Sequence, residues 1–407
     1  MNTPSEVAVT GLGVVAPHGD HPDTLFEALL QGRSAIAPVF PELPKPAAAA
    51  TVAFDESRWF TKLQLAGVDR VSQLAVAAAD LAMRDAGIPA LADSGLDAER
   101  VGVYGGCGMG GAAALEAAYR GNGRVSPLTI PAFMPNAPAA HVSMRQGVQG
   151  PVLTYSVACA SSSVAIAEAA KAIQRDEVDL AIAGGSEALI VPGVVLAWQA
   201  MMTLAGFQSG EAAQAVRPFA ADRSGFALGE GAAFVVLESA ERARRRGARI
   251  HALLAGWGLS SDATHLTKPD APGQARALRS ALRQAGLAPR DVGYCNAHGT
   301  ATRIGDVVER NALAAVWGDD LDGLRTSSTK ALHGHLLGGA GALEAAITIL
   351  ALRERRLPPN VNGGQIDPDC ALNLVAPGDA EAPALEAAIS NSFAFGGTNS
   401  VLLFRRA

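Results

Sequence analysis

The sequence predicts an α/β protein built from two similar halves. Its 407 residues exceed what one hydrophobic core usually supports. Residues 152–157 are β-branched and aromatic, a stretch with apolar residues at helical spacing follows, and 178–183 form a second apolar run. That order is typical of a βαβ unit. Strands and helices alternate again in the second part of the chain, so we expect halves at residues 1–247 and 248–407.

Apolar periodicity predicts the other elements in order. Strands are expected at 7–10, 101–104, 232–237, 251–257, 292–295, 387–389 and 401–404, and helices at 24–30, 69–86, 240–246 and 342–352. Gly11-Leu12-Gly13-Val14-Val15-Ala16 matches a dinucleotide-binding pattern, but Pro17 follows where a phosphate-binding helix would begin. We therefore interpret the glycines as a turn after a strand. Residues 35–60 are rich in Pro and Ala and are expected to be irregular.

Composition excludes several classes of protein. The net charge of −6, from 33 basic and 39 acidic residues, gives no reason to expect nucleic acid as a partner. Four cysteines without paired spacing predict neither a disulfide framework nor a metal site. No apolar run reaches about 18 residues, and the first residues do not resemble a signal peptide. We expect a cytoplasmic protein with free thiols and no membrane contact.

Cys159 lies at the predicted turn between the strand and the helix of the βαβ unit. The unpaired N–H groups and the dipole of a helix N-terminus favour negative charge. We therefore expect this thiol to be a better thiolate than a free cysteine. The alternative is that Cys159 is a small buried hydrophobe in a closely packed helix.

Two histidine segments of the second half support a catalytic interpretation. His298 follows the predicted strand 292–295, at the sheet edge where α/β active sites lie. Asp306 and Glu309, further on, form a capping-box pattern, which explains both structurally.

Lys330, His333 and His335 precede a glycine-rich loop and an apolar helix, and only one of these two histidines need be functional. A third segment, 393–399, has the pattern of a glycine hairpin with buried aromatic residues. One activated cysteine and two separated histidines suggest acyl transfer through a thioester. A Cys–His–Asn protease is the generic alternative.

Four motifs, in order, carry a family resemblance. They are Ala158-Cys159-Ala160-Ser161; Asn296-Ala297-His298-Gly299-Thr300-x-Thr302-x-x-Gly305-Asp306; Lys330-x4-His335-x2-Gly338; and Phe395-Gly396-Gly397-Thr398-Asn399. Together they resemble the condensing enzymes of the β-ketoacyl-[acyl-carrier-protein] synthase I/II type. The resemblance implies the thiolase fold, in which two pseudo-symmetric α/β halves pack as a layered αβαβα core.

The resemblance also implies a reaction and roles for individual residues. Cys159 would hold an acyl group as a thioester, and decarboxylation of malonyl carried by an acyl carrier protein (ACP) would supply the attacking enolate. No cofactor is expected, since phosphopantetheine arrives on the carrier protein. The implied catalytic residues are Cys159, His298, His335, Lys330 and Glu344. The backbone N–H groups of Cys159 and Phe395 would form the oxyanion hole, and the Phe395 side chain would gate the malonyl pocket. Substrate contacts would come from Thr300, Thr302, Met109, Trp198 and Phe393, and residues 130–138 would line the acyl tunnel, partly across a dimer interface.

Three departures from the family pattern favour a specialised synthase over housekeeping fatty-acid elongation. Residues 62–70, where basic side chains often meet the carrier protein, are largely apolar, Trp198 replaces smaller residues, and Thr302-Arg303-Ile304 replaces the usual Thr-Pro. Fatty-acid and type II polyketide or aryl polyene biosynthesis are the expected pathways, and these departures favour the polyketide or aryl polyene type. Carrier docking then uses other arginines or a partner subunit.

The sequence also bears on the quaternary state and on three related classes of protein. A homodimer is expected, and a heterodimer with a chain-length factor is the alternative. A thiolase would need a late cysteine in a glycine loop, whereas Cys370 lies in a polar connection. An initiating synthase would have asparagine where His335 stands. A non-catalytic chain-length factor would lack the nucleophile that Cys159 supplies.

Overall fold

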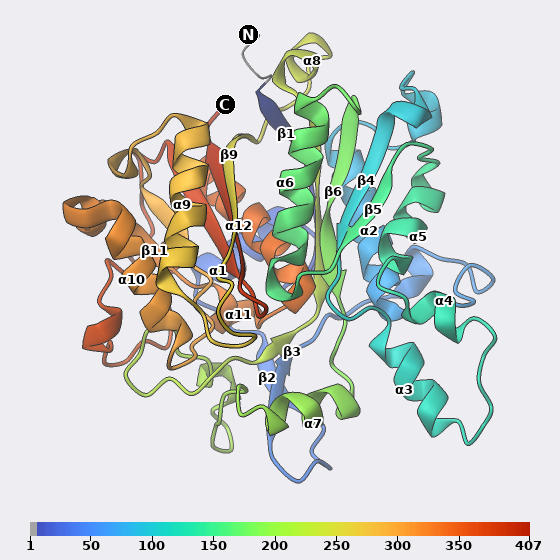
Figure 1. Cartoon of the computed structure of the whole chain (residues 1–407). Coiled ribbons are helices and arrows are strands. Elements are labelled where there is room, and N and C mark those ends of the chain that lie inside the picture. The colour runs from blue at the N-terminus through green and yellow to red at the C-terminus, as the bar shows by residue number, and fades with distance from the viewer. Residues whose placement is uncertain (1–5) are drawn as a thin grey trace.

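A computed structural model describes residues 6–407 and contains one large sheet of ten strands (Figure 1). The strands lie in the order β11-β10-β12-β13-β9-β1-β8-β6-β4-β5. A separate sheet has the order β2-β3-β7. The strands are β1 (Val7–Val15), β2 (Ile36–Val39), β3 (Ala47–Ala50), β4 (Val101–Gly106), β5 (Val152–Tyr155), β6 (Leu180–Glu187), β7 (Leu228–Gly229), β8 (Gly231–Ser239), β9 (Ala252–Ser261), β10 (Tyr294–Asn296), β11 (Arg325–Ser327), β12 (Ala387–Phe393) and β13 (Thr398–Arg405).

The large sheet repeats one topology on either side of the β1–β9 pair. From β1 outward the order is β8, β6, β4, β5, and from β9 outward it is β13, β12, β10, β11. In both series the first two pairings are antiparallel and the last two are parallel. Each half therefore places its strands in the spatial order 1-5-4-2-3 of its own chain sequence.

Helices cover both faces of each half. They are α1 (Pro22–Leu30), α2 (Arg70–Asp85), α3 (Ala112–Arg120), α4 (Thr129–Phe133), α5 (Ala137–Gln146), α6 (Ser161–Gln174), α7 (Pro192–Ala200), α8 (Ala240–Arg245), α9 (Ala271–Ala285), α10 (Gly305–Trp317), α11 (Lys330–His333) and α12 (Ala340–Glu354). Helices α6 and α12 pack against each other and against strands of both halves, while α2 and α9 pack on the outer faces (Figure 1). The expected αβαβα layering is confirmed.

Helices α6 and α12 form the middle layer, between the strands of the two halves, and their burial there accounts for their composition. Every residue of α12 from Ala340 to Leu352 is buried, and apart from Glu344 and Thr348 this stretch is apolar on all sides. Gly341 lets α12 approach α6, since a Cβ there would lie 2.8 Å from the backbone nitrogen of Ser163. The two helices carry the loops that precede them, with Cys159 and His335, to the same place between the two halves.

Several expectations about local structure were wrong. The glycines at 11 and 13 lie inside β1, not in a turn, and residues 35–60 contain β2 and β3. Strand β6 continues through Gly184-Gly185 to Glu187. Strand β5, expected to be buried, is the partly exposed edge of the large sheet. In each case pairing with a distant segment, which local composition does not reveal, decided the outcome.

Substitution of Gly13 by alanine should destabilise the fold. A Cβ at this position would lie 1.9 Å from the carbonyl oxygen of Ala78 in α2, so helix and strand would have to move apart. Overpacking of this kind costs about 1–3 kcal/mol in the free energy of unfolding. Urea denaturation of Gly13→Ala measures the loss. Gly323→Ala, where nothing lies within 4 Å, is the control and should stay within about 0.5 kcal/mol of wild type; equal stability of the two variants would contradict the packing.

Candidate active site

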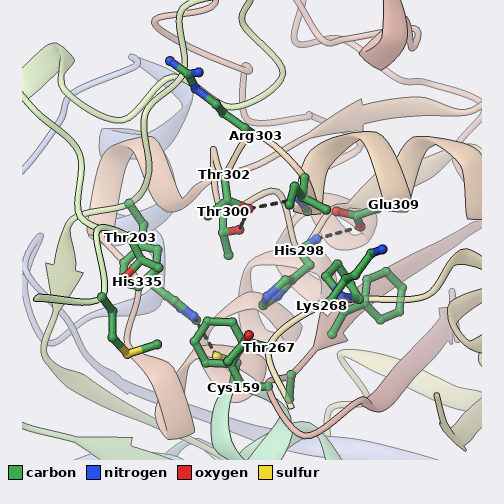
Figure 2. A pocket seen from close by; sticks show the side chains of 18 of the residues that line it. Cys159, Thr203, Thr267, Lys268, His298, Thr300, Thr302, Arg303, Glu309 and His335 are labelled. Carbon is green, nitrogen blue, oxygen red and sulfur yellow. Dashed lines mark hydrogen bonds between the residues drawn. The ribbon is translucent and has the colours of Figure 1, made fainter. Parts of the chain in front are cut away.

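A cavity of about 740 Å³ opens where the two halves meet (Figure 2). Cys159, His298 and His335 line it together with two threonines and several aromatic residues. These are Thr300, Thr302, Trp198, Phe226, Phe393 and Phe395. The three groups come from segments that are far apart in sequence: the turn before α6, the loop after β10 and the loop after α11. The topology therefore collects the cysteine and both histidine segments at one site.

The turn that presents Cys159 is tight. Ala158 has a φ of +48°, a conformation that non-glycine residues rarely adopt. The Ser161 hydroxyl closes the turn, since Oγ donates to the carbonyl of Ala158 (2.6 Å) and accepts from the N–H of Val157 (2.9 Å). Gly106 leaves room for the start of α6, because a Cβ there would lie 2.2 Å from the nitrogen of Ser162. The turn thus fixes the direction of the thiol.

Backbone bonds to the glycine-rich segment before β8 hold His335 in place. The N–H of His335 donates to the carbonyl of Ala227 (2.8 Å), and its carbonyl accepts from the N–H of Gly229 (2.9 Å). A short parallel bridge between Leu228 and His335 results. His333 points elsewhere: its ring nitrogens bond the carbonyl of Gly334 and the hydroxyl of Thr329. Of the two candidate histidines, only His335 lines the cavity.

A buried carboxylate positions His298. The two oxygens of Glu309 accept from the N–H groups of His298 (2.9 Å) and Gly299 (2.8 Å), and Asn391 donates to the same carboxylate (3.0 Å). Asp306 accepts from the N–H of Phe219 (2.8 Å). The capping-box interpretation of Asp306 and Glu309 was therefore wrong, since neither side chain caps α10. Glu309 instead binds the backbone of the loop that carries His298, and Asp306 binds the backbone of Phe219.

The three chemical groups form a compact cluster. One ligand atom from each of Cys159, His298 and His335 lies within 4.8 Å of the others, and all three residues are buried. The Sγ of Cys159 is 3.1 Å from Nε2 of His335. The two imidazole rings meet edge to face with centroids 5.5 Å apart. Within residues 6–407, Nδ1 of each ring is buried without a hydrogen-bond partner.

A buried ion pair lies beside this cluster. Lys330 Nζ donates to Glu344, and both side chains are fully buried. Burial, reinforced by the charge of Lys330, holds the pKa of His298 and of His335 well below the ordinary value. Both imidazoles are therefore neutral near pH 7. A neutral imidazole with its proton on Nε2 can donate a hydrogen bond into the cavity without carrying charge.

The expectation of a ready thiolate was wrong for the unliganded chain. Burial raises the pKa of Cys159 to about 12, although the Lys330 charge and the N–H groups of Phe395 and Cys159 act in the opposite direction. Desolvation of the charged sulfur outweighs these favourable contacts. The resting state is thus a thiol, with Nε2 of His335 within hydrogen-bond distance of its sulfur.

Aromatic side chains form one wall of the cavity. Trp198 stacks on Phe395, with ring centroids 6.2 Å apart, and meets Phe226 edge to face at 5.5 Å. Phe393 contacts the His298 ring at 6.1 Å. Met109, in contrast, is 44% exposed and does not line this cavity. The structure therefore places Trp198, Phe393 and Phe395 at the thiol and leaves Met109 outside.

Thr300 and Thr302 lie toward the mouth of the cavity, on a loop that Arg223 fixes (Figure 2). Their hydroxyls are 3.2 Å apart. Arg223 is buried and donates to the carbonyls of Thr302 (3.0 Å) and Arg303 (2.6 Å) as well as to Asp367 (2.7 Å). The loop with the two hydroxyls is therefore held rigidly.

Comparison with known proteins agrees with this geometry. The family model described as the beta-ketoacyl synthase N-terminal domain matches residues 4–243, and its C-terminal counterpart matches residues 251–364. The chain belongs to the beta-ketoacyl synthase family.

Two relatives and one solved structure illustrate this membership. Nodulation protein E of Rhizobium meliloti (strain 1021) is 41% identical, covering 98% of this chain and 99% of the relative. The 3-oxoacyl-[acyl-carrier-protein] synthase 2 of Coxiella burnetii is 37% identical, covering 98% of each. The structure described as the ishigamide ketosynthase/chain length factor superposes with a TM-score of 0.91 at 32% identity, covering 100% of each chain.

Glu187 is a buried residue of this beta-ketoacyl synthase that sequence reasoning missed. It ends β6, and its carboxylate accepts from the N–H groups of Gly108 (2.7 Å), Met109 (3.3 Å) and Gly338 (3.0 Å). A Cβ at Gly338 would lie 2.3 Å from the nitrogen of Gly108. The carboxylate thus joins the glycine loop of the first half to the loop that follows His335. A glutamate directly after a glycine-containing strand was the available signal.

Glu187 should make the stability of the fold depend on pH. Burial raises its pKa to about 7 from an ordinary value of 4.5. The folded chain therefore binds an extra proton between these values, and the unfolding free energy should fall by roughly 3 kcal/mol as the pH rises from about 4.5 to about 7. Denaturant titrations of wild type and Glu187→Gln across this window isolate the effect. Asp306 and Glu344, whose pKa values are also raised to about 7, contribute equally to both proteins; parallel stability curves would contradict the assignment.

Among residues 6–407, no helix combines the length and the apolar character needed to cross a membrane.

Proposed function

We propose that this chain is a β-ketoacyl-[acyl-carrier-protein] synthase that joins an acyl group on Cys159 to a malonyl unit on ACP with loss of CO2. The observation that carries the proposal is the buried cluster of one thiol and two neutral imidazoles within 4.8 Å of one another, in a cavity that reaches solvent through polar residues. The membership of the family and the name of the Coxiella burnetii relative support the same reaction.

Acyl transfer is the first step. The Sγ of Cys159 attacks the carbonyl of the acyl-carrier thioester, the bond to the pantetheine sulfur breaks, and the thiol proton passes to that departing sulfur, so that His335 keeps its proton on Nε2. The acyl carbonyl oxygen receives hydrogen bonds from the backbone N–H groups of Cys159 and Phe395. Both N–H groups already act on the thiol sulfur in the resting site, so they face the reacting atoms. Donors held in place before the reaction stabilise the developing negative charge.

Decarboxylation and condensation follow. The malonyl thioester oxygen takes hydrogen bonds from His298 and His335, the bond to the carboxylate carbon breaks, and CO2 leaves. The enolate then attacks the thioester carbonyl on Cys159, a carbon–carbon bond forms as the bond between that carbonyl and Sγ breaks, and the departing Cys159 thiolate takes a proton from water. Lys330 and Glu344 lie behind the two histidines: burial together with the Lys330 ammonium keeps both imidazoles uncharged, and Glu344 pairs with that ammonium. Uncharged donors suit an oxygen whose negative charge is transient.

The mouth of the cavity suits a carrier-bound substrate. Thr300 and Thr302 offer hydroxyls along the cavity, where the amides of a pantetheine arm need hydrogen-bond partners. The exposed side chains of Lys268 and Arg303 lie at the same mouth and can meet the phosphate of phosphopantetheine and the acidic surface of a carrier protein. They add basic groups to the two, Lys62 and Arg70, of the otherwise largely apolar stretch 62–70.

A dimer completes the proposal. Strand β5 is a sheet edge with exposed Val152 and Leu153, and the exposed side chains of Ile130, Met134 and Met144 come from the helices that follow α3. An uncovered edge with apolar side chains is a pairing surface. We propose a second copy of this chain as the partner and a chain-length factor as the alternative, which the name of the ishigamide structure supports. Light scattering of the purified chain distinguishes a homodimer from a monomer that awaits a partner.

The direct test of the reaction is product analysis. The purified chain is incubated with an acyl-ACP and malonyl-ACP, and CO2 and a 3-oxoacyl-ACP are measured by radiolabel and mass spectrometry. We expect one CO2 for each 3-oxoacyl product. Varying the acyl group then distinguishes fatty-acid from polyketide or aryl polyene substrates. Formation of 3-oxoacyl-ACP without release of CO2 would exclude decarboxylative condensation.

A further inference from the structure

We propose that the resting active site is also a binding site for one Zn²⁺ ion, which Cys159, His298 and His335 hold and which reversibly blocks acyl transfer. Tetrahedral zinc takes sulfur at about 2.3 Å and imidazole nitrogen at about 2.0–2.1 Å, so its ligand atoms lie roughly 3.5 Å apart. In this chain one atom of each side chain lies within 4.8 Å of the others, and Sγ is already 3.1 Å from Nε2 of His335. Small side-chain movements complete the three-ligand geometry.

The donor set selects the kind of metal. A thiolate and two imidazoles suit Zn²⁺ and similar borderline-soft ions, whereas Mg²⁺ and Ca²⁺ require oxygen ligands. Glu309 also lines the cavity, but both of its oxygens accept backbone N–H groups of His298 and Gly299. The fourth coordination position faces the cavity, where water can occupy it. The resulting site has three protein ligands and one exchangeable ligand.

The surroundings indicate an exchangeable ion rather than a permanent one. The Lys330 ammonium lies close enough to oppose a second cation, but it is paired with Glu344, and the carboxylate of Glu309 adds negative charge nearby. Zinc-binding histidines usually donate their second N–H to a carboxylate or carbonyl, and loss of such a partner costs about 10–100-fold in affinity. Within the described part of the chain, Nδ1 of His298 and of His335 has no such partner.

Metal binding and acyl transfer exclude each other because both use the sulfur atom of Cys159. A zinc–sulfur bond forms as the S–H bond of Cys159 breaks, the proton passes to the buffer, and no oxidation occurs. The bound sulfur can no longer attack a thioester. Conversely, a Cys159 that carries an acyl group has no thiolate to offer to the metal. Free Zn²⁺ would thus inhibit the resting chain and spare the acylated one.

Cobalt(II) provides the test, since it occupies zinc sites and its bond to a thiolate gives a charge-transfer absorption band. The metal-free chain is titrated with Co²⁺ without any substrate. We expect one equivalent to bind with a thiolate-to-cobalt band, added Zn²⁺ to abolish that band, and His335→Ala to weaken binding at least about tenfold. Cys370→Ala, which removes a buried thiol outside the cluster, should leave the titration unchanged.

Loss of the charge-transfer band in Cys159→Ala and in wild type alkylated at Cys159 would support the site. The alkylated protein is folded before it is modified, so it controls for misfolding of the Cys159→Ala variant. Absence of a thiolate band in wild type, or its persistence after alkylation of Cys159, would overturn the proposal. Because the titration contains no substrate, its outcome is independent of whether the chain performs the proposed condensation.

Discussion

Cys159→Ala should lose condensation while it keeps the ability to decarboxylate malonyl-ACP. The variant has no atom on which to hold an acyl group, so formation of 3-oxoacyl product should fall by at least about 10³-fold. His298, His335 and the Lys330–Glu344 pair remain, and in the proposed mechanism these groups bind the malonyl oxygen or set the charge of those that do. Release of CO2 from malonyl-ACP should therefore persist within about tenfold of wild type.

The control for this prediction is Cys370→Ala, which removes another buried thiol that does not line the cavity. It should retain both activities. Condensation by Cys159→Ala at a rate near that of wild type would show that another group carries the acyl chain.

His298→Ala should keep acylation of Cys159 while it loses decarboxylation and condensation. His335, not His298, is within hydrogen-bond distance of the thiol sulfur, so formation of the acyl–Cys159 adduct should stay within about tenfold of wild type. Loss of one hydrogen-bond donor to a developing oxyanion costs about 10²–10³ in rate, so decarboxylation and condensation should fall by that factor. Stopped assays for the acyl adduct and for CO2, run on the same preparation, separate the two steps.

His21→Ala, which changes an exposed histidine outside the cavity lining, is the matched control and should be unaffected in both assays. Equal loss of acylation and decarboxylation in His298→Ala would mean that the residue supports the site as a whole instead of acting on the malonyl oxygen.

Local patterns predicted the elements around the site well. The helix after Cys159, the helix expected at 69–86 and the apolar helix expected at 342–352 are confirmed as α6, α2 and α12. The family inferred from four motifs is confirmed as well. These features depend on neighbours within a few residues or on fixed motif spacing, which a single sequence displays directly.

Features that depend on distant packing were not predicted. Glycine lowers the propensity to form a strand, but Gly11 and Gly13 allow α2 to pack closely on β1. The central position of β1 in the large sheet offsets the low propensity. The thiol of Cys159 stands at a helix N-terminus as expected, but burial between two halves dominates its pKa. Glu309 matched a capping pattern, and only the tertiary structure brings it to the backbone of His298. The catalytic roles of the individual residues stay predictions.

The measurement that tests the central claim most directly is the intact mass of the chain after incubation with an acyl-ACP, followed by peptide mapping. The account predicts one acyl group per chain, located on the peptide that contains Cys159, absent from Cys159→Ala, and lost on addition of malonyl-ACP as CO2 and 3-oxoacyl-ACP appear. An acyl group on a different peptide, or an adduct on Cys159 that malonyl-ACP does not discharge, would contradict it.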